Sequence, residues 1–119
     1  MVMFPNTSTA MSQRRRLPNR RASTTYTFEC NSLRYTATVS FFPNGDLAEI
    51  FLGNAKAGSH SDAAAKDSAI LCSLCLQHNV PIDVIRKALL RDSRGKASSP
   101  LGVALDLLAA LDEPEGGRC

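Results

Sequence analysis

The stretch Leu33-Arg-Tyr-Thr-Ala-Thr-Val-Ser-Phe-Phe42, followed by Pro43-Asn-Gly-Asp46, decides the fold class of this chain. Apolar and polar side chains alternate along residues 33–42, and this period of two predicts a strand with one buried face. Pro43 fixes its φ angle and Asn44-Gly45 tolerates positive φ, so residues 43–46 predict a tight turn. A tight turn joins antiparallel strands, because parallel strands need a long crossover.

Two further strands flank this one. Residues 24–30 alternate in the same way, with Tyr26, Phe28 and Cys30 on one face, and Asn31-Ser32 is a short turn signal. Residues 47–52 follow the second turn and predict a third strand. The result is a three-stranded antiparallel meander. Its second face is rich in threonine and is expected to be solvated or to dock a partner.

The period changes to a helical one after Gly58. Ser59 and Ser61 are candidate N-caps, and residues 62–78 predict a helix that Asn79-Val80-Pro81 ends. A second helix follows Pro81, and a third begins at Ser98-Ser99-Pro100. The predicted buried stripes are Ile70, Leu71, Leu74 and Cys75 in the first helix, Ile82, Ile85, Ala88 and Leu89 in the second, and Leu101, Ala104, Leu105, Leu108 and Leu111 in the third. Strands first and helices afterwards predict an α+β domain with three helices packed on one sheet face.

Charge divides the chain unevenly. Of its 119 residues, 1–22 hold five arginines and no acidic residue, a net charge of +5, whereas the remainder holds nine basic and eleven acidic residues, a net −2. Residues 1–22 show no apolar period, so they cannot offset their ordering entropy by burial. We predict a disordered basic arm over 1–22, one folded domain over 23–112 and a flexible tail over 113–119.

The expected location is the cytoplasm. No apolar run approaches the roughly 20 residues that span a bilayer. The first arginines follow a weak apolar stretch, which is the reverse of the order in a secretory signal. The four cysteines are unevenly spaced and do not indicate a disulfide framework.

One combination of motifs resembles a known family. The order Gly45-Asp-Leu-Ala-Glu-Ile-Phe51 into Gly58-Ser59, then a helix ending in Gln77-His-Asn-Val-Pro-Ile82, is similar to the TSCPD domain. That domain is the C-terminal module of cobalamin-dependent, class II ribonucleoside-diphosphate reductases and also occurs as short free-standing proteins. The resemblance covers about residues 24–111. The Thr-Ser-Cys-Pro-Asp stretch that names the family matches residues 97–101, where Ser98 and Pro100 agree and Ala97, Ser99 and Leu101 differ.

The resemblance implies an association with ribonucleotide reduction. As the family runs it, the reaction needs a radical-generating cofactor, a buried cysteine and a reducing dithiol inside a barrel of several hundred residues. A chain of 119 residues has no room to enclose cobalamin and a nucleotide. We therefore predict no catalytic residue and no cofactor bound by this chain alone, with cobalamin reached only through a larger partner. Ser98, Ser99 and Pro100 are interpreted as a structural remnant of the family motif.

Cys72-Ser-Leu-Cys75 lies deep in a predicted helix. A redox pair favours a helix N-terminus, where a thiol pKa falls, so core packing is the preferred interpretation, with redox and metal binding as alternatives. A zinc site needs two more ligands, and no second tight pair exists. His60 and His78 have no carboxylate partner at a fixed spacing. We predict no metal site.

Two segments are candidate binding sites. Residues 53–59 connect a strand to a helix, so Lys56 and the backbone of Gly58 and Ser59 are a weak anion or nucleotide site, with ordinary capping as the alternative. Arg14, Arg15, Arg16, Arg20 and Arg21 are a weak nucleic-acid contact, with a solubilising tail as the alternative.

Three hypotheses of function follow. The first is a non-catalytic binding or accessory module that pairs with itself, with a ribonucleotide reductase or with another nucleotide-metabolising protein. The second is a component of a class II ribonucleoside-diphosphate reductase that acts with separate catalytic subunits. The third is a nucleic-acid-associated protein that uses the arginine-rich arm.

Overall fold

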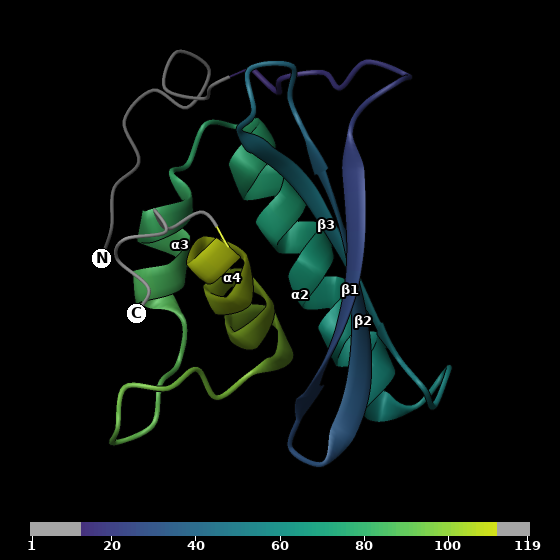
Figure 1. Cartoon of the computed structure of the whole chain (residues 1–119), viewed down its shortest axis with the longest axis vertical. Coiled ribbons are helices and arrows are strands. Elements are labelled where there is room, and N and C mark those ends of the chain that lie inside the picture. Colours follow the sequence, from purple (N-terminus) through teal and green to yellow (C-terminus); the bar gives the residue numbers. More distant parts are fainter. Residues whose placement is uncertain (1–12, 112–119) are drawn as a thin grey trace, which may run out of the picture.

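The computed structural model describes residues 13–111. Its strands are β1 (Ser23–Cys30), β2 (Leu33–Phe41) and β3 (Leu47–Asn54), and its helices are α2 (His60–Gln77), α3 (Ile82–Ala88) and α4 (Pro100–Leu111). The strands form one antiparallel sheet in the order β1-β2-β3. Figure 1 shows the three helices together on one side of this sheet. The predicted α+β meander with its helices on one face is confirmed.

Both hairpin turns follow from residues that accept unusual backbone angles. Asn31 and Ser32 have φ values of 54° and 67°, the left-handed pair that a two-residue hairpin needs. In the second turn Gly45 has a φ of 95°, and its N–H donates to the carbonyl of Phe42 over 2.8 Å. The side chain of Asn44 accepts from the N–H of Asp46 and closes the turn.

The core lies between the sheet and the helix layer. Phe28, Tyr35 and Val39 are buried on the predicted face, and the register pairs Phe28 with Tyr35. A shift in the β2–β3 register falls between Ser40 and Phe41. Both Phe41 and its neighbour Phe42 are consequently turned toward the domain, Phe41 half-buried and Phe42 buried. The opposite, threonine-rich face carries no helix (Figure 1).

The predicted buried stripe of α2 is wrong. Ile70, Leu71 and Leu74 are 53%, 63% and 37% exposed, and Cys75 is exposed as well. The buried residues are instead the small Ala65 and Ala69, with Cys72 and Leu76 on the same face. Small side chains let the helix approach β3 closely, whereas the large aliphatic side chains face outward. We call Ile70, Leu71 and Leu74 the α2 stripe.

The two later helices follow the prediction more closely. In α3, Ile85 is buried, Ile82 and Leu89 are half-buried, and the predicted Ala88 is exposed. In α4 the buried set is Leu101, Gly102, Ala104, Leu105 and Leu108, while the predicted Leu111 is 64% exposed. The hydroxyl of Tyr26 donates to the Ala104 carbonyl over 2.8 Å and ties α4 to β1. No helix within residues 13–111 is long and apolar enough to cross a membrane.

Polar side chains of α2 hydrogen-bond the backbone of three residues on the outer edge of β3. Asp62 accepts from the N–H of Asn54. The Ser73 hydroxyl accepts from the Ile50 N–H over 2.9 Å and donates to the Ile50 carbonyl over 3.1 Å. Gln77 donates to the carbonyl of Ala48. These three contacts explain why α2 carries polar residues on its sheet-facing side, since a buried backbone group needs a partner.

Candidate functional site

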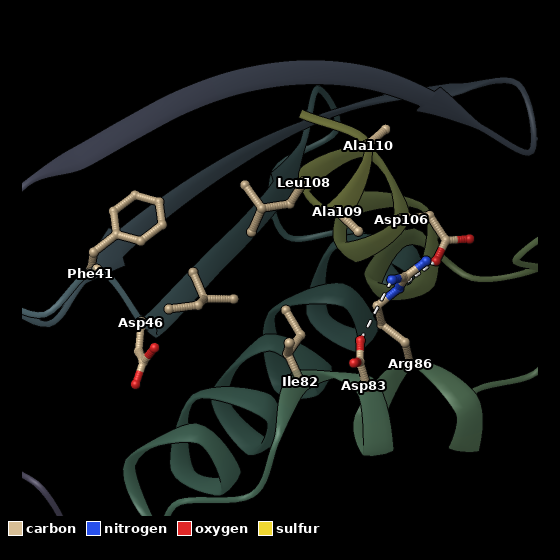
Figure 2. Close-up of a pocket in the computed structure, with 11 residues that line it drawn as sticks. Phe41, Asp46, Ile82, Asp83, Arg86, Asp106, Leu108, Ala109 and Ala110 are labelled. Carbon is tan, nitrogen blue, oxygen red and sulfur yellow. Dashed lines mark hydrogen bonds and ion pairs between the residues drawn. The ribbon is translucent and has the colours of Figure 1, made fainter. Parts of the chain in front are cut away.

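The cavity drawn in Figure 2 lies between the β2–β3 turn, α3 and α4. Its volume is about 590 Å³. Leu47, Ile82 and Leu108 give it apolar walls. Asp46 and Asp83 also line it, and the side chains of both are more than half exposed. Such a mixture of apolar walls and polar groups is typical of a small-molecule or peptide pocket.

One wall of this cavity is a closed ion-pair cluster. Asp106 of α4 accepts from both Arg91 (2.8 and 2.9 Å) and Arg86 of α3 (3.0 Å). The hydrogen bonds from Arg91, followed by those from Arg86, lower the pKa of Asp106. Asp106 therefore stays ionised at neutral pH and is unsuited to act as a general acid. The cluster joins α3, the segment after it and α4.

A second cavity of about 380 Å³ adjoins the first and shares Asp46, Leu47 and Ile82 with it. Its distinguishing group is Arg15, from the segment that precedes β1. The Arg15 guanidinium lies 3.6 Å from the centroid of the Phe42 ring and 3.8 Å from a carboxylate oxygen of Asp46. The arm thus forms part of the cavity wall, which the sequence does not predict.

The structure describes the arm from residue 13, and residues 13–22 contain no helix or strand. Arg14 donates to the side chain of Gln77 over 2.6 Å, and the Arg15 N–H donates to the Gln77 carbonyl over 2.7 Å. Arg21 forms a 2.8 Å ion pair with Glu49, whose carboxylate is largely buried. Three of the five predicted arginines therefore contact the domain. That residues 1–22 form a disordered arm stays a prediction.

Arg16 and Arg20 differ from these three arginines. Both are exposed and have no hydrogen-bond or ion-pair partner within residues 13–111. Arg14, Arg15, Arg16 and Arg21 also line a cavity of about 740 Å³ beside Glu49 and Gln77. The nucleic-acid contact predicted for the five arginines stays a prediction, with two of them fully available for it.

The loop predicted as an anion site is occupied by a carboxylate of the chain itself. Asp62 accepts from the N–H of Gly58 over 3.0 Å, and Lys66 donates to it over 2.6 Å. The Lys66 hydrogen bond, with those from the Asn54 and Gly58 backbone, lowers the pKa of Asp62 from 3.8 to about 2. Ser59 caps α2, since its hydroxyl accepts from the Asp62 N–H. A bound anion has to compete with Asp62 for these donors.

Lys56 takes no part in this carboxylate site. Its backbone N–H donates to the Asn54 side chain, and its residue is exposed. The sequence pattern included Asp62 only as the first residue of the helix predicted over 62–78 and did not indicate its burial. A signal was available, because Asp62 lies three residues after a serine cap and four before Lys66.

The stretch that matches the family motif builds the start of α4. The Ser99 hydroxyl accepts from the N–H of Gly102 over 3.2 Å, and Pro100 is the first residue of the helix. Gly102 is required here, since a Cβ at its position would lie 2.8 Å from the Cβ of Ala97. The Ser98 N–H donates to the Leu90 carbonyl and closes the preceding loop. These contacts agree with the structural interpretation of residues 98–100.

The cysteines within residues 13–111 differ in burial. Cys72 is buried, and burial raises its pKa to about 12. Burial also raises the pKa of Cys30, which lies far from the pair in the sequence. The core interpretation holds for Cys72 and is wrong for Cys75, which is exposed. A protonated thiol is a poor nucleophile and a poor metal ligand.

The histidines lie apart from one another along α2. His60 is the exposed first residue of the helix, and His78 is half-buried just beyond its end. Within residues 13–111, no group of three or more His, Cys, Asp or Glu side chains is placed to hold a metal ion. Cys119 lies outside the described residues.

The fold and these contacts define a small α+β domain in which a helix layer covers one face of a three-stranded meander. Residues 7–111 match the family model of the TSCPD domain. The chain therefore belongs to the TSCPD domain family, as the resemblance predicted. No curated protein and no solved structure matches it.

Proposed function

We propose that this chain is a non-catalytic accessory module that binds a larger enzyme of ribonucleotide reduction and acts with its separately encoded catalytic chain. The observation that carries the proposal is the family match over residues 7–111. The TSCPD domain resembled by this sequence is a module attached to cobalamin-dependent reductases. In this proposal the chain supplies the same module to the catalytic chain, and the radical chemistry and the cobalamin belong to the partner.

The state of the polar groups supports a binding role. Asp62 and Asp106 are held ionised by cationic partners, so neither is poised to exchange a proton near neutral pH. Cys72 has a pKa near 12 and Cys30 a raised pKa, so neither thiol favours the thiolate that reduces a disulfide. These features stabilise the domain, and catalysis is assigned to the partner.

The α2 stripe is the surface that we assign to the partner. Ile70, Leu71 and Leu74 share one helix face and remain exposed. The charged residues one turn before them are Lys66, which is paired with Asp62, and the exposed Asp67. An exposed apolar helix face of this kind is typical of helix-in-groove recognition. The partner is therefore expected to offer an apolar groove to α2.

The test uses the full chain and the purified catalytic chain of a cobalamin-dependent ribonucleotide reductase that lacks a TSCPD module. Calorimetric titration is expected to show saturable binding. Leu71→Asp is expected to weaken it by about tenfold or more, because a carboxylate is costly to bury in an apolar groove. Leu90→Asp is the matched control, since Leu90 is 74% exposed and lies off α2. It is expected to bind as the unaltered chain does.

Two results would contradict the proposal. One is the absence of any heat of binding with a folded chain and an active reductase. The other is deoxyribonucleotide formation by the isolated chain, which would make it an enzyme. The nucleic-acid hypothesis receives less support, since Arg14, Arg15 and Arg21 already have partners in the domain.

A further inference from the structure

The backbone groups on the free side of β1 can be assigned from the hairpin turn. In an antiparallel ladder, the N–H and C=O of one residue point to the same neighbour, and the direction alternates along the strand. The two-residue turn makes Cys30 and Leu33 a hydrogen-bonded pair. Counting back from Cys30, the residues whose N–H and C=O point away from β2 are Ser23, Thr25, Thr27 and Glu29.

The same alternation predicts which backbone groups of β3 point away from β2. It assigns outward-pointing groups to Ala48, Ile50, Leu52 and Asn54. Three of these four, Ala48, Ile50 and Asn54, have backbone groups that hydrogen-bond to side chains of α2. The hydrogen bonds on the β3 edge therefore support this alternation, and it applies equally to β1.

The outer edge of β1 has no such cover. Within residues 13–111, the outward N–H and C=O groups of Ser23, Thr25, Thr27 and Glu29 find no hydrogen-bond partner, and all four residues are exposed. Natural edge strands are blunted by proline, lysine or a bulge. β1 contains none of these, pairs with β2 without a register shift over all eight residues, and carries only Glu29 as a charge.

We propose that a second copy of this chain adds its own β1 to this edge in antiparallel orientation, giving a continuous six-stranded sheet. Charge favours that orientation. The end of β1 carries the acidic Glu29, while its beginning is preceded by the exposed Arg20, which has no partner within residues 13–111; the neighbouring Arg21 is already paired with Glu49. Antiparallel pairing brings the acidic end of each strand to the basic end of the other, whereas parallel pairing in register places the two Glu29 carboxylates side by side.

The surface of α4 explains why the occupant is a whole domain. α4 contacts β1 and is fixed to it by the Tyr26–Ala104 hydrogen bond. Leu107 and Leu111 of α4 are 40% and 64% exposed. An added peptide strand leaves them in water. A second copy related by a twofold axis normal to the sheet brings its α4 to the same side of the joined sheet, where the two helices are able to cover these residues.

The area that a stable interface buries also favours a whole domain as the partner. A standard interface buries about 800 Å² per partner, more than a single strand pair supplies. The contact therefore needs both the strand edge and the α4 side chains. It uses none of the α2 stripe, so it goes beyond the proposed function and is separable from it.

Sedimentation velocity of the full chain at increasing concentration tests the proposal. The expected mass rises from 12.8 kDa to twice that value. Thr25→Pro removes one outward N–H without removing a β1–β2 hydrogen bond, and is expected to weaken the dimer by about tenfold or more. Thr27→Lys, which places a cation on the edge of each copy, is expected to act in the same direction if the proline variant fails to fold.

Two control variants separate this edge from the other exposed surfaces. Phe51→Lys alters the open sheet face on β3, and Leu71→Asp alters the α2 stripe. Both are expected to leave the dimer intact, while Thr25→Pro leaves the binding of the reductase chain intact. A chain that stays at 12.8 kDa at the highest soluble concentration overturns the proposal. So does a dimer that dissociates with Phe51→Lys or Leu71→Asp and survives Thr27→Lys.

Discussion

The two edges of the sheet belong to strands of equal length, but only the β3 edge is hydrogen-bonded by side chains of a helix. On the β3 edge, Asp62, Ser73 and Gln77 of α2 reach the backbone of Asn54, Ile50 and Ala48. On the β1 edge, the outward groups inferred for Thr25 and Thr27 have no hydrogen-bond partner within residues 13–111. The covered edge completes the domain by itself. The uncovered edge leaves hydrogen-bonding capacity that another chain is able to use.

The polar residues beside the two edges also differ in burial. Gln77 and Asp62 are each 1% exposed, and they are buried because the edge of β3 needs donors and acceptors. The threonines of β1 are exposed and form no comparable contacts with a helix. Polar residues of α2 therefore stabilise the monomer, whereas the exposed threonines of β1 lie on a strand whose outer edge has no partner within residues 13–111.

The largest effect is expected from Asp62. Its pKa is about 2 in the folded chain and 3.8 without its partners, so its contribution to stability is present above pH 4 and is lost as the pH falls toward 2. Asp62→Asn is expected to be markedly less stable at pH 7 and to lose little more between pH 4 and pH 2. Urea denaturation across that range measures the difference. Asp67→Asn, on the exposed face of α2, is the control and should keep the acid-dependent loss.

A smaller effect is expected from Ser73. Ser73→Ala leaves both the N–H and the carbonyl of Ile50 without their partner, which costs about 2 kcal/mol of unfolding free energy. Ser68→Ala serves as the control, since its hydroxyl donates only to the Ala65 carbonyl of its own helix. Equal losses from the two variants would show that α2 does not stabilise the edge of β3.

The smallest effect concerns exchange rates and leaves the sequence unchanged. At low concentration, the amides of Thr25 and Thr27 are expected to exchange with deuterium at least about tenfold faster than those of Ile50 and Asn54. Raising the concentration is expected to slow the two β1 amides and to leave the two β3 amides as they were. Slow exchange on both edges in a dilute sample would remove the distinction between them.

The sheet was predictable because its signals are local. Alternation along 33–42, together with turns at Asn31-Ser32 and Asn44-Gly45, indicates antiparallel pairing without knowledge of any distant residue. The exposed stripe of α2 was not predictable in the same way. Ala65 and Leu71 are both acceptable on a buried helix face, and which of them faces the sheet depends on how closely the helix approaches it.

The candidate sites also differ in whether their contacts are local or distant in the sequence. Ser59 and Ser99 were predictable as helix caps, since a cap contacts an N–H only a few residues away. The contacts of Arg14 and Arg15 with Gln77 join residues more than sixty positions apart, and no local pattern reports them. The wall that Arg15 adds to the cavities was missed for the same reason.

By itself, the sequence determined the meander, the order of strands and helices, and the family, because period, turn chemistry and motif order act over short distances along the chain. Only the tertiary structure decided which face of α2 meets the sheet, which backbone edge receives Asp62, Ser73 and Gln77, and which edge stays open. Those outcomes depend on the distance between elements that are remote in sequence, and burial and hydrogen bonding are decided by that distance.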